Sequence, residues 1–343
     1  MENMRQRMRH LFRRNKRRFR PTTAPTTEQK EEHAADEKPE ANDASAKEVV
    51  EIEIIPLPLA EDEMPTYFHV GALAKECLSN GFKIGAWQLQ CTTRTNTDFN
   101  ISTFGEGYPT MESIFGGLEV FKDFGNYSMS LSWLTNNDFL SEIEGRGISF
   151  GSKLYAQLKS VIGTKDEVTF KTKIKCGFER KPVKMELVVP LYKEPLFLGY
   201  VVVTPMENWI LGYRTIYDFD AKGFDKHAFC LGYYNDRTEV GLKLENFEDL
   251  RGSIFQRIGD AWGFALKSNL YSSANVKQFA VGVQYDFNNG TLVKVKFRED
   301  TRTGFVFQSK IGENVDVMYH LAFDANSPVK GNKRIGVSWY FHS

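Results

Sequence analysis

The sequence predicts an all-β protein, a membrane-spanning β-barrel that begins with one short helix and is preceded by a disordered tail. Three observations lead to this fold class. Apolar and polar residues alternate with a period of two from about residue 82 to residue 342. No apolar run in the sequence reaches the roughly 18–20 residues that a membrane-spanning helix needs. The polar strand faces carry rows of Lys and Arg, which stay hydrated only if that face meets water.

The first 63 residues form the predicted tail. Residues 1–20 contain nine Lys or Arg and one acid, whereas residues 21–63 contain three Lys and thirteen acids. This stretch is rich in Pro, Thr, Ala and charge, so it buries too little apolar surface to offset the entropy lost on ordering. We therefore expect a disordered extension at 1–63, with a basic part (1–20) and an acidic part (21–63), and a folded domain at 64–343.

One short helix is expected at about residues 66–80, directly before the first strand. Thr66 is a suitable N-cap residue, and Gly81 a suitable stop. The apolar side chains between them recur at helical spacing, namely Tyr67, Val70, Leu73, Ala74, Cys77 and Leu78. Lys75 lies off this apolar stripe, so we expect it to face water.

Strands are expected from about residue 82 onward, each with an apolar face and a polar face. One apolar face consists of Val168, Phe170, Thr172, Ile174, Cys176 and Phe178, and the intervening polar face contains Lys171, Lys173, Lys175 and Glu179. In a later segment, Val293, Val295 and Phe297 alternate with Lys294, Lys296 and Arg298. Between these two segments, Trp209, Leu211 and Tyr213 alternate with Gly212 and Arg214.

A large soluble β-sandwich is the competing interpretation of this alternation. The strand pattern continues for about 260 residues with almost no helix, which is long for one sandwich. Aromatic residues at expected strand ends fit the aromatic girdles of a membrane barrel, namely Trp209, Tyr217, Tyr319, Trp339 and Tyr340. Charges inside a narrow barrel would each lose several kcal/mol of hydration. The pattern therefore indicates a wide, water-filled barrel, which is a channel.

Composition and motifs argue against several other functions. The 44 Lys and Arg balance the 44 Asp and Glu, so no nucleic-acid partner is expected. The four Cys and six His lack metal-ligand spacing, and we expect reduced thiols, no metal and no cofactor. Residues 147–151 spell the Gly-x-Ser-x-Gly of a hydrolase nucleophile elbow, but both flanks look like strands, whereas the elbow needs a strand, a turn and a helix. The protein is therefore not expected to be an enzyme.

Several motifs occur in the order and spacing of one known family. Pro65, Thr66 and Tyr67, followed by Gly71 and the pair Lys75–Glu76, resemble that family's N-terminal helix, and Gly81 and Gly85 match its glycine hinge. Residues 208–213, 252–257 and 331–336 resemble three further family segments, and residues 285–307 align without gaps to the signature region, with Lys296 on the signature lysine. The chain thus resembles the voltage-dependent anion channels, the eukaryotic mitochondrial porins, from about Met64 to Ser343.

The resemblance implies a 19-stranded transmembrane barrel in the mitochondrial outer membrane, with the N-terminal helix inside the pore. It also implies a voltage-gated channel for small ions and metabolites such as adenine nucleotides, surrounded by the lipid bilayer. Selectivity in such a pore depends on its width and on the charges that line it. A homo-oligomer, and cytosolic proteins that bind the tail, are open possibilities.

The chain departs from the family pattern at positions that carry charge. Two family helix lysines fall at Ala72 and Asn80, and the lysine of a nucleotide-contact segment falls at Ser149. A lipid-facing family glutamate falls near Trp133. Fewer helix lysines mean a weaker anion preference, so the alternative function is a porin-derived scaffold that recruits proteins through its tail.

Eight basic residues are candidate pore-lining or selectivity positions, namely Lys75, Lys171, Lys173, Lys175, Arg214, Lys294, Lys296 and Arg298. Cations that face the lumen raise the local concentration of anions. The competing interpretation of each is a solvated charge without a role in selectivity. Six further residues are candidate helix and hinge positions, namely Pro65, Thr66, Tyr67, Gly71, Gly81 and Gly85.

Overall fold

The structure is a computed structural model, and it describes residues 56, 59, 63–82, 85–108, 114–163, 168–273, 278–287, 289–327 and 333–343. The described residues form nineteen strands and two short helices. The predicted tail, residues 1–63, lies outside the described residues except for residues 56, 59 and 63. Its disorder and its partners are therefore still predictions.

The strands follow one another along the chain and are mostly 8–12 residues long. They are β1 (Trp87–Arg94), β2 (Phe99–Gly107), β3 (Phe115–Asp123), β4 (Tyr127–Leu134), β5 (Asp138–Ser149), β6 (Ser152–Gly163), β7 (Thr169–Arg180), β8 (Val183–Tyr192), β9 (Leu196–Val203), β10 (Trp209–Asp218), β11 (Gly223–Tyr234), β12 (Thr238–Glu245), β13 (Asp249–Ile258), β14 (Trp262–Ser272), β15 (Phe279–Asp286), β16 (Leu292–Arg298), β17 (Arg302–Ile311), β18 (Val315–Asp324) and β19 (Arg334–His342).

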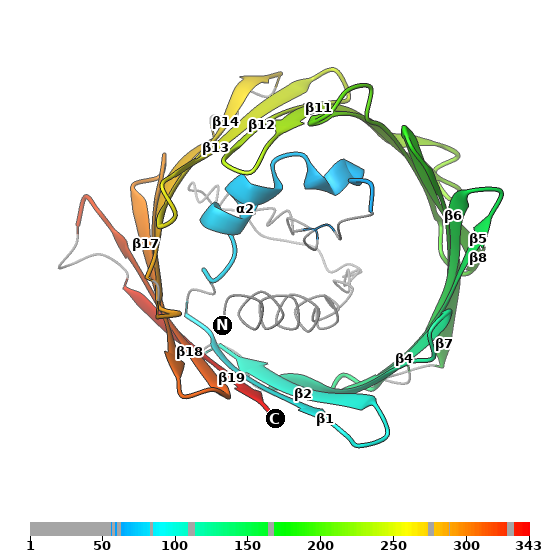
Figure 1. Cartoon of the computed structure of the whole chain (residues 1–343), viewed down its shortest axis with the longest axis horizontal. Coiled ribbons are helices and arrows are strands. Elements are labelled where there is room, and N and C mark those ends of the chain that lie inside the picture. Colours follow the sequence, from blue (N-terminus) through cyan, green and yellow to red (C-terminus); the bar gives the residue numbers. More distant parts are fainter. Residues whose placement is uncertain are drawn as a thin grey trace, which may run out of the picture. The chain divides into compact units, whose positions relative to one another are not determined.

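These strands close into a single barrel (Figure 1). Each strand pairs antiparallel with the next one in sequence, and β1 also pairs with β19. Because the number of strands is odd, the first and last strands run in the same direction and their pairing is parallel, with Trp87 opposite Val337. Closure leaves no unpaired sheet edge. The all-β barrel of nineteen strands implied by the resemblance is confirmed.

Alternation along the strands gives the barrel two different faces. In β7, Phe170 and Phe178 are 41% and 36% exposed, whereas Glu179 is 7% exposed. Residues that pair across strands share a face, so Glu179 lies with Lys184, and Phe178 lies with Met185. The inner segment described below contacts the face of Glu179. The polar face therefore lines the lumen, and the large apolar side chains cover the outside.

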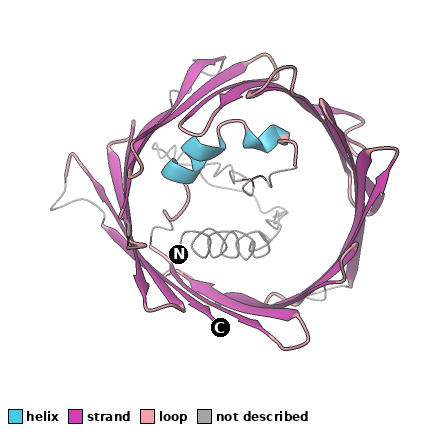
Figure 2. Ribbon diagram, viewed as in Figure 1, coloured by secondary structure: helices cyan, strands magenta, loops and turns pink. Residues whose placement is uncertain are grey.

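Two short helices lie inside the barrel (Figure 2). A 3₁₀-helix, η1, spans Tyr67–His69, and an α-helix, α2, spans Ala72–Leu78. The segment predicted as one helix at about 66–80 is thus divided, because Val70 is extended and Gly71 has a φ of 77°. Glycine adopts this left-handed conformation without the steric cost that a Cβ imposes. Residues 64–81 are called the inner segment from here on.

The ends of the inner segment follow the predicted cap and hinge residues. The N–H of Thr66 donates to Nδ1 of His69 at 2.9 Å, which fixes the start of η1. Gly81 and Gly85, which lie between α2 and β1, have φ values of 92° and 77°. No helix in the described ranges is long and apolar enough to cross a membrane.

Candidate functional site

The lumen is the candidate functional site, because it contains the charged side chains and the inner segment. Helix η1 contacts β9 and β10, and α2 contacts β13, β14 and β15. The inner segment therefore follows the inside of the wall (Figure 1). It narrows the lumen on one side and leaves the wall of β4–β6 facing it.

An apolar cluster holds η1 against the wall. Tyr67 and Val70 pack on wall residues of β9, β10 and β11, namely Tyr200, Val202, Ile210, Ala228 and Cys230. Tyr67 is almost fully buried, and this desolvation raises the pKa of its phenol well above the ordinary value. The Tyr67 side chain is therefore a neutral anchor rather than a titrating group in the pore.

A second apolar cluster holds α2. Ala74, Cys77 and Leu78 pack against Phe255 of β13 and Ala265 of β14. Cys77 has no exposed surface, and burial raises the pKa of its thiol to about 11. The apolar stripe predicted from helical spacing therefore faces the wall, and Leu73 is the exposed member of that stripe.

Glycines in the wall make room for the inner segment. A Cβ at Gly241 of β12 would lie 2.9 Å from Val70 Cγ1 and 3.1 Å from the main-chain N of Gly71. A Cβ at Gly282 of β15 would lie 2.6 Å from Leu78 Cδ2. These approaches are too close for any larger residue without a shift. Sequence reasoning did not identify these glycines, although a glycine inside a strand is a recognised sign of close approach.

The start of the inner segment is bound to β7 and β8 by charged side chains. The N–H of Met64 donates to Glu179 Oε1 at 3.2 Å, and Lys184 Nζ donates to the Met64 carbonyl at 3.0 Å. Lys184 also pairs with Glu179 at 3.0 Å and with Glu63 at 3.5 Å. Lys184 is 3% exposed, so these contacts are shielded from water. The predictions included neither Lys184 nor Glu179 as a site residue.

A carboxylate of the wall binds the first turn of α2. The N–H groups of Ala72 and Leu73 donate to the two oxygens of Glu239, at 2.8 Å and 2.6 Å. The first N–H groups of a helix have no partner within the helix, and an acid is the favoured group beside them. Glu239 on β12 therefore serves as the cap that Gly71 lacks a side chain to provide.

Two predicted pore-lining lysines bind the last turn of α2. Lys294 Nζ donates to the carbonyl of Glu76 at 2.7 Å and to that of Asn80 at 3.3 Å, and Lys296 Nζ donates to the carbonyl of Leu78 at 3.1 Å. Lys294 is 3% exposed. Both lysines lie on the inner face of the wall, and their donors bind the end of the helix. Arg298, the third of this row, lies 3.8 Å from Asp300.

The other predicted lysine row lies on β7 and faces the lumen. Lys171, Lys173 and Lys175 alternate with the outward Phe170 and Ile174 on β7. Lys175 pairs with Glu186 at 3.3 Å. Among the described residues, Lys171 and Lys173 make no ion pair, so their charges are available to solutes.

Three further basic residues gather around Tyr67. Arg214 of β10 lies over the rings of Phe68 and Tyr200, with 5.9 Å from its guanidinium carbon to each ring centroid. Lys243 of β12 lies 5.1 Å from the centroid of the Tyr67 ring, and Lys75 of α2 lies near Lys243. Lys75 and Arg214 were predicted to line the pore, and Lys243 was missed. Neighbouring like charges in a water-filled lumen attract anions.

The lumen also contains acids that the predictions did not include. Glu142 pairs with Lys159 at 3.7 Å, Glu186 with Lys175, and Glu245 with Lys226 at 3.0 Å. These acids and lysines lie on the same polar strand faces as the predicted cations. The alternation with a period of two could therefore have identified them as lumen residues too. The lumen has mixed charge, and its cationic stretches are local.

The outer face is apolar and partly aromatic, as the girdle prediction required. Trp209 packs against Tyr233 with ring centroids 5.4 Å apart, and Trp262 packs against Tyr285 at 4.7 Å. Tyr340 is a correction to the predicted girdle. It pairs across strands with Asp316, and its hydroxyl donates to Gln88 at 3.3 Å, so it faces the lumen.

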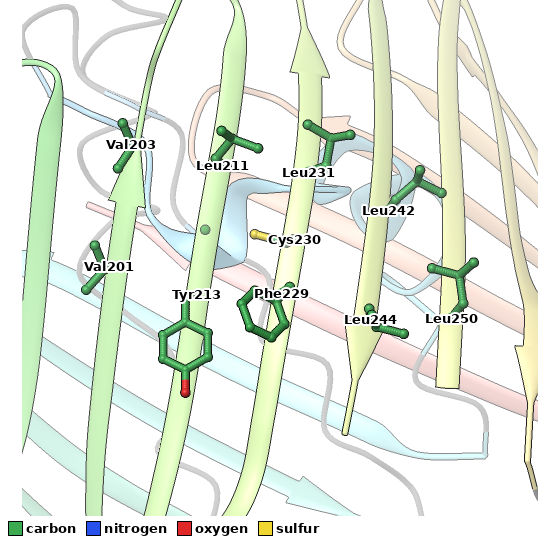
Figure 3. A pocket seen from close by; sticks show the side chains of 11 residues that line it. Val201, Val203, Leu211, Tyr213, Phe229, Cys230, Leu231, Leu242, Leu244 and Leu250 are labelled. Atoms are coloured by element: carbon green, nitrogen blue, oxygen red, sulfur yellow. The ribbon is translucent and has the colours of Figure 1, made fainter. Parts of the chain in front are cut away.

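A shallow depression of about 390 Å³ lies over β9–β13, lined mainly by outward side chains such as Leu211, Phe229 and Leu242 (Figure 3). Because its lining is almost entirely apolar and lies on the outer face, the depression is separate from the solute path. It does not contain the chemistry of a solute site.

The motifs that resemble enzyme signatures occur in hairpins. Ser149 ends β5, and Phe150 and Gly151 form the turn to β6, so the context is strand, turn and strand. No group of three or more His, Cys, Asp or Glu in the described part of the chain is arranged to hold a metal ion.

Comparison with known proteins agrees with this architecture. The family model described as eukaryotic porin matches residues 63–336. The voltage-dependent anion-selective channel of Drosophila melanogaster is 25% identical over 286 residues, which cover 80% of this chain and 97% of that protein. The non-selective voltage-gated ion channel VDAC3 of Bos taurus is 21% identical over 281 residues, with coverage of 80% and 97%. A triple mutant of Rh. blastica porin superposes with a TM-score of 0.45 at 12% identity, covering 68% of this chain and 96% of that one. Because the family match spans nearly all of the barrel, the chain belongs to the eukaryotic porin family.

Proposed function

We propose that the chain forms a voltage-gated channel for small ions and metabolites, such as adenine nucleotides, in the mitochondrial outer membrane, with a modest preference for anions. The observation that carries the proposal is the division of the closed barrel into an apolar outer face and a charged lumen. Lipid is compatible only with the first face, and hydrated solutes only with the second.

Family membership supports the channel function, but the relatives do not decide its selectivity. The fly relative is named anion-selective, and the cattle relative is named non-selective. Selectivity must therefore be argued from the lumen of this chain. Two cationic stretches favour anions, the row Lys171, Lys173 and Lys175 on β7, and Lys75 with Arg214 around the inner segment. Acids such as Glu142 and Glu245 reduce this preference, which is why we expect it to be modest.

The proposal is tested by the reversal potential of the refolded full chain in a planar bilayer under a salt gradient. We expect channels whose reversal potential favours anions. Replacing both Lys171 and Lys173 by Gln should move the potential toward the cation side, because these charges have no acid partner among the described residues.

A matched control is available on the other face of the barrel. Lys122 shares the outer face with Phe99, its partner across strands, and its Nζ lies 4.1 Å from the centroid of the Phe99 ring. Lys122→Gln should therefore leave the reversal potential unchanged. Folded barrels without any conductance would contradict the proposed function, and a cation-favouring wild-type potential would contradict the anion preference.

A further inference from the structure

The geometry points to a charged strap that positions the inner segment: Glu239, Lys294 and the pair Glu179–Lys184 hold residues 64–81 against the wall at three separate places. Each of the three contacts joins a side chain of the barrel to main-chain groups of the inner segment. The contacts are spread from β7 and β8 through β12 to β16, so they span the length of the segment.

The first step of the argument is that α2 needs outside partners. It has seven residues, and a helix of this length is not stable alone in water. Its first N–H groups and last carbonyls have no partner within the helix. The barrel supplies an acceptor, Glu239, at the N-terminal end and a donor, Lys294, at the C-terminal end. The signs match the partial charges of the two helix ends, so neither side chain could replace the other.

The second step concerns what fixes the position of α2 along the wall. Apolar packing of Cys77 and Leu78 favours contact with the wall but allows the helix to slide or rotate, because the hydrophobic effect is non-directional. Hydrogen bonds to the main chain at both ends fix the position along the wall. Glu239 and Lys294 are 4% and 3% exposed, and charge-assisted hydrogen bonds shielded from water are the strong ones.

The third step concerns the start of the segment. Lys184 binds the Met64 carbonyl while Glu179 binds the Met64 N–H, and the two side chains pair with each other. This end lies on β7 and β8, apart from the strands that hold α2. The inner segment is therefore fixed at both ends, and Lys75 is held at a fixed place beside Lys243. The docked inner segment narrows the cross-section of the pore, and this consequence rests on the proposed channel function. The docking of residues 64–81 does not rest on it.

Two native cysteines report on the two ends separately. Cys77 of α2 is buried against β13 and β14, and Cys230 of β11 is buried under η1. The experiment treats the refolded full chain in detergent micelles with a small charged maleimide and measures the rate of modification of each cysteine by peptide mass spectrometry. The rates need no current, so a failure of the channel function and a failure of the strap are distinguishable.

In the wild type, we expect both buried cysteines to react slowly. Glu239→Gln puts an amide N–H₂ opposite one of the two helix N–H groups, and Lys294→Met removes the donors at the other end. Each variant should raise the rate at Cys77 by about tenfold or more, and Lys294→Arg should keep it low. Lys184→Met should raise the modification rate at Cys230 more than the rate at Cys77.

The matched controls are Glu142→Gln and Lys159→Gln, which break a lumen ion pair that does not touch the inner segment. They should leave both rates unchanged. The strap is overturned if wild-type Cys77 reacts as fast as a thiol in the denatured chain, or if Glu239→Gln and Lys294→Met both leave its rate unchanged. It is equally overturned if the control variants raise the rates as much as the strap variants do.

Discussion

Lys294 donates from its Nζ to the main-chain carbonyl of Glu76 at 2.7 Å, although 218 residues separate the two in the sequence. The contact joins β16, the fourth strand from the C-terminus, to the helix that precedes β1. A lysine on a polar strand face is thus a cap for a helix end. This relationship shows that the wall and the inner segment are one structural unit, and that some lumen charges bind the inner segment.

Replacing Tyr67 by Phe should leave the stability of the barrel unchanged or raise it by up to about 1 kcal/mol. The Tyr67 hydroxyl is buried, and it has no hydrogen-bond partner among the described residues. Its desolvation is therefore not compensated, and phenylalanine keeps the packing of the ring on Tyr200 and Val202. The midpoint of thermal unfolding in detergent, followed by circular dichroism, measures the effect.

Tyr155→Phe is the contrasting variant, because the Tyr155 hydroxyl bonds to Glu186 across the lumen wall. It should lower the midpoint, since a buried carboxylate loses a donor. Equal loss of stability in both variants would mean that Tyr67 has a polar partner in the folded protein.

Gly241→Ala should destabilise the barrel by about 1–3 kcal/mol, because the added methyl group overpacks the contact between β12 and the inner segment. The new Cβ would lie 2.8 Å from Ser253 Oγ, 2.9 Å from Val70 Cγ1 and 3.1 Å from the main-chain N of Gly71. The two side chains can move, but the main-chain atom is held by the neighbouring bonds to Glu239. Thermal unfolding of the variant measures this cost.

Gly147→Ala provides the same chemical change in an open place, since a Cβ at Gly147 of β5 would have no atom within 4 Å. Its midpoint should stay close to the wild type. A Gly241→Ala midpoint that matches that of Gly147→Ala would show that the inner segment does not rest on β12.

The strand pattern was predictable because each residue's face depends on local alternation. Phe170 and Lys171 lie on opposite faces in the barrel as the period of two required. The alternation alone did not predict a closed sheet of nineteen strands, because periodicity gives the two faces of each strand but not the number of strands or their closure. That prediction came from the family resemblance of motifs such as residues 208–213.

The inner segment was less predictable, because its structure depends on long-range contacts. The helical spacing of Ala74, Cys77 and Leu78 identified the face that packs on the wall. Helical spacing did not predict the break at Gly71 or the cap by Glu239. The cap comes from a residue 167 positions away in the sequence. Local propensity contains no information on such a distant partner. For the same reason, the sequence predicted Lys294 as a pore-lining residue and did not predict its contact with the helix end.

Raising the pH should make Cys77 reactive only at strongly alkaline values. Burial raises the pKa of this thiol from 9.0 to about 11, and the thiolate is the reactive form. The rate of maleimide modification of Cys77 in the folded wild type should therefore rise with a midpoint near 11. The folded pKa lies above the unfolded one, so the stability that the neutral thiol contributes is fully present below pH 9.0 and is lost as the pH approaches 11.

The denatured full chain is the control, because unfolding removes the desolvation that is the largest cause of the shift. Its Cys77 should titrate with a midpoint near 9.0, the ordinary value. Lys294 opposes the shift through its positive charge, so Lys294→Arg, which keeps that charge and a donor, should leave the folded midpoint near 11. A folded midpoint near that of the denatured chain would mean that α2 leaves the wall often enough to hydrate Cys77, which the buried contacts at Glu239 and Lys294 argue against.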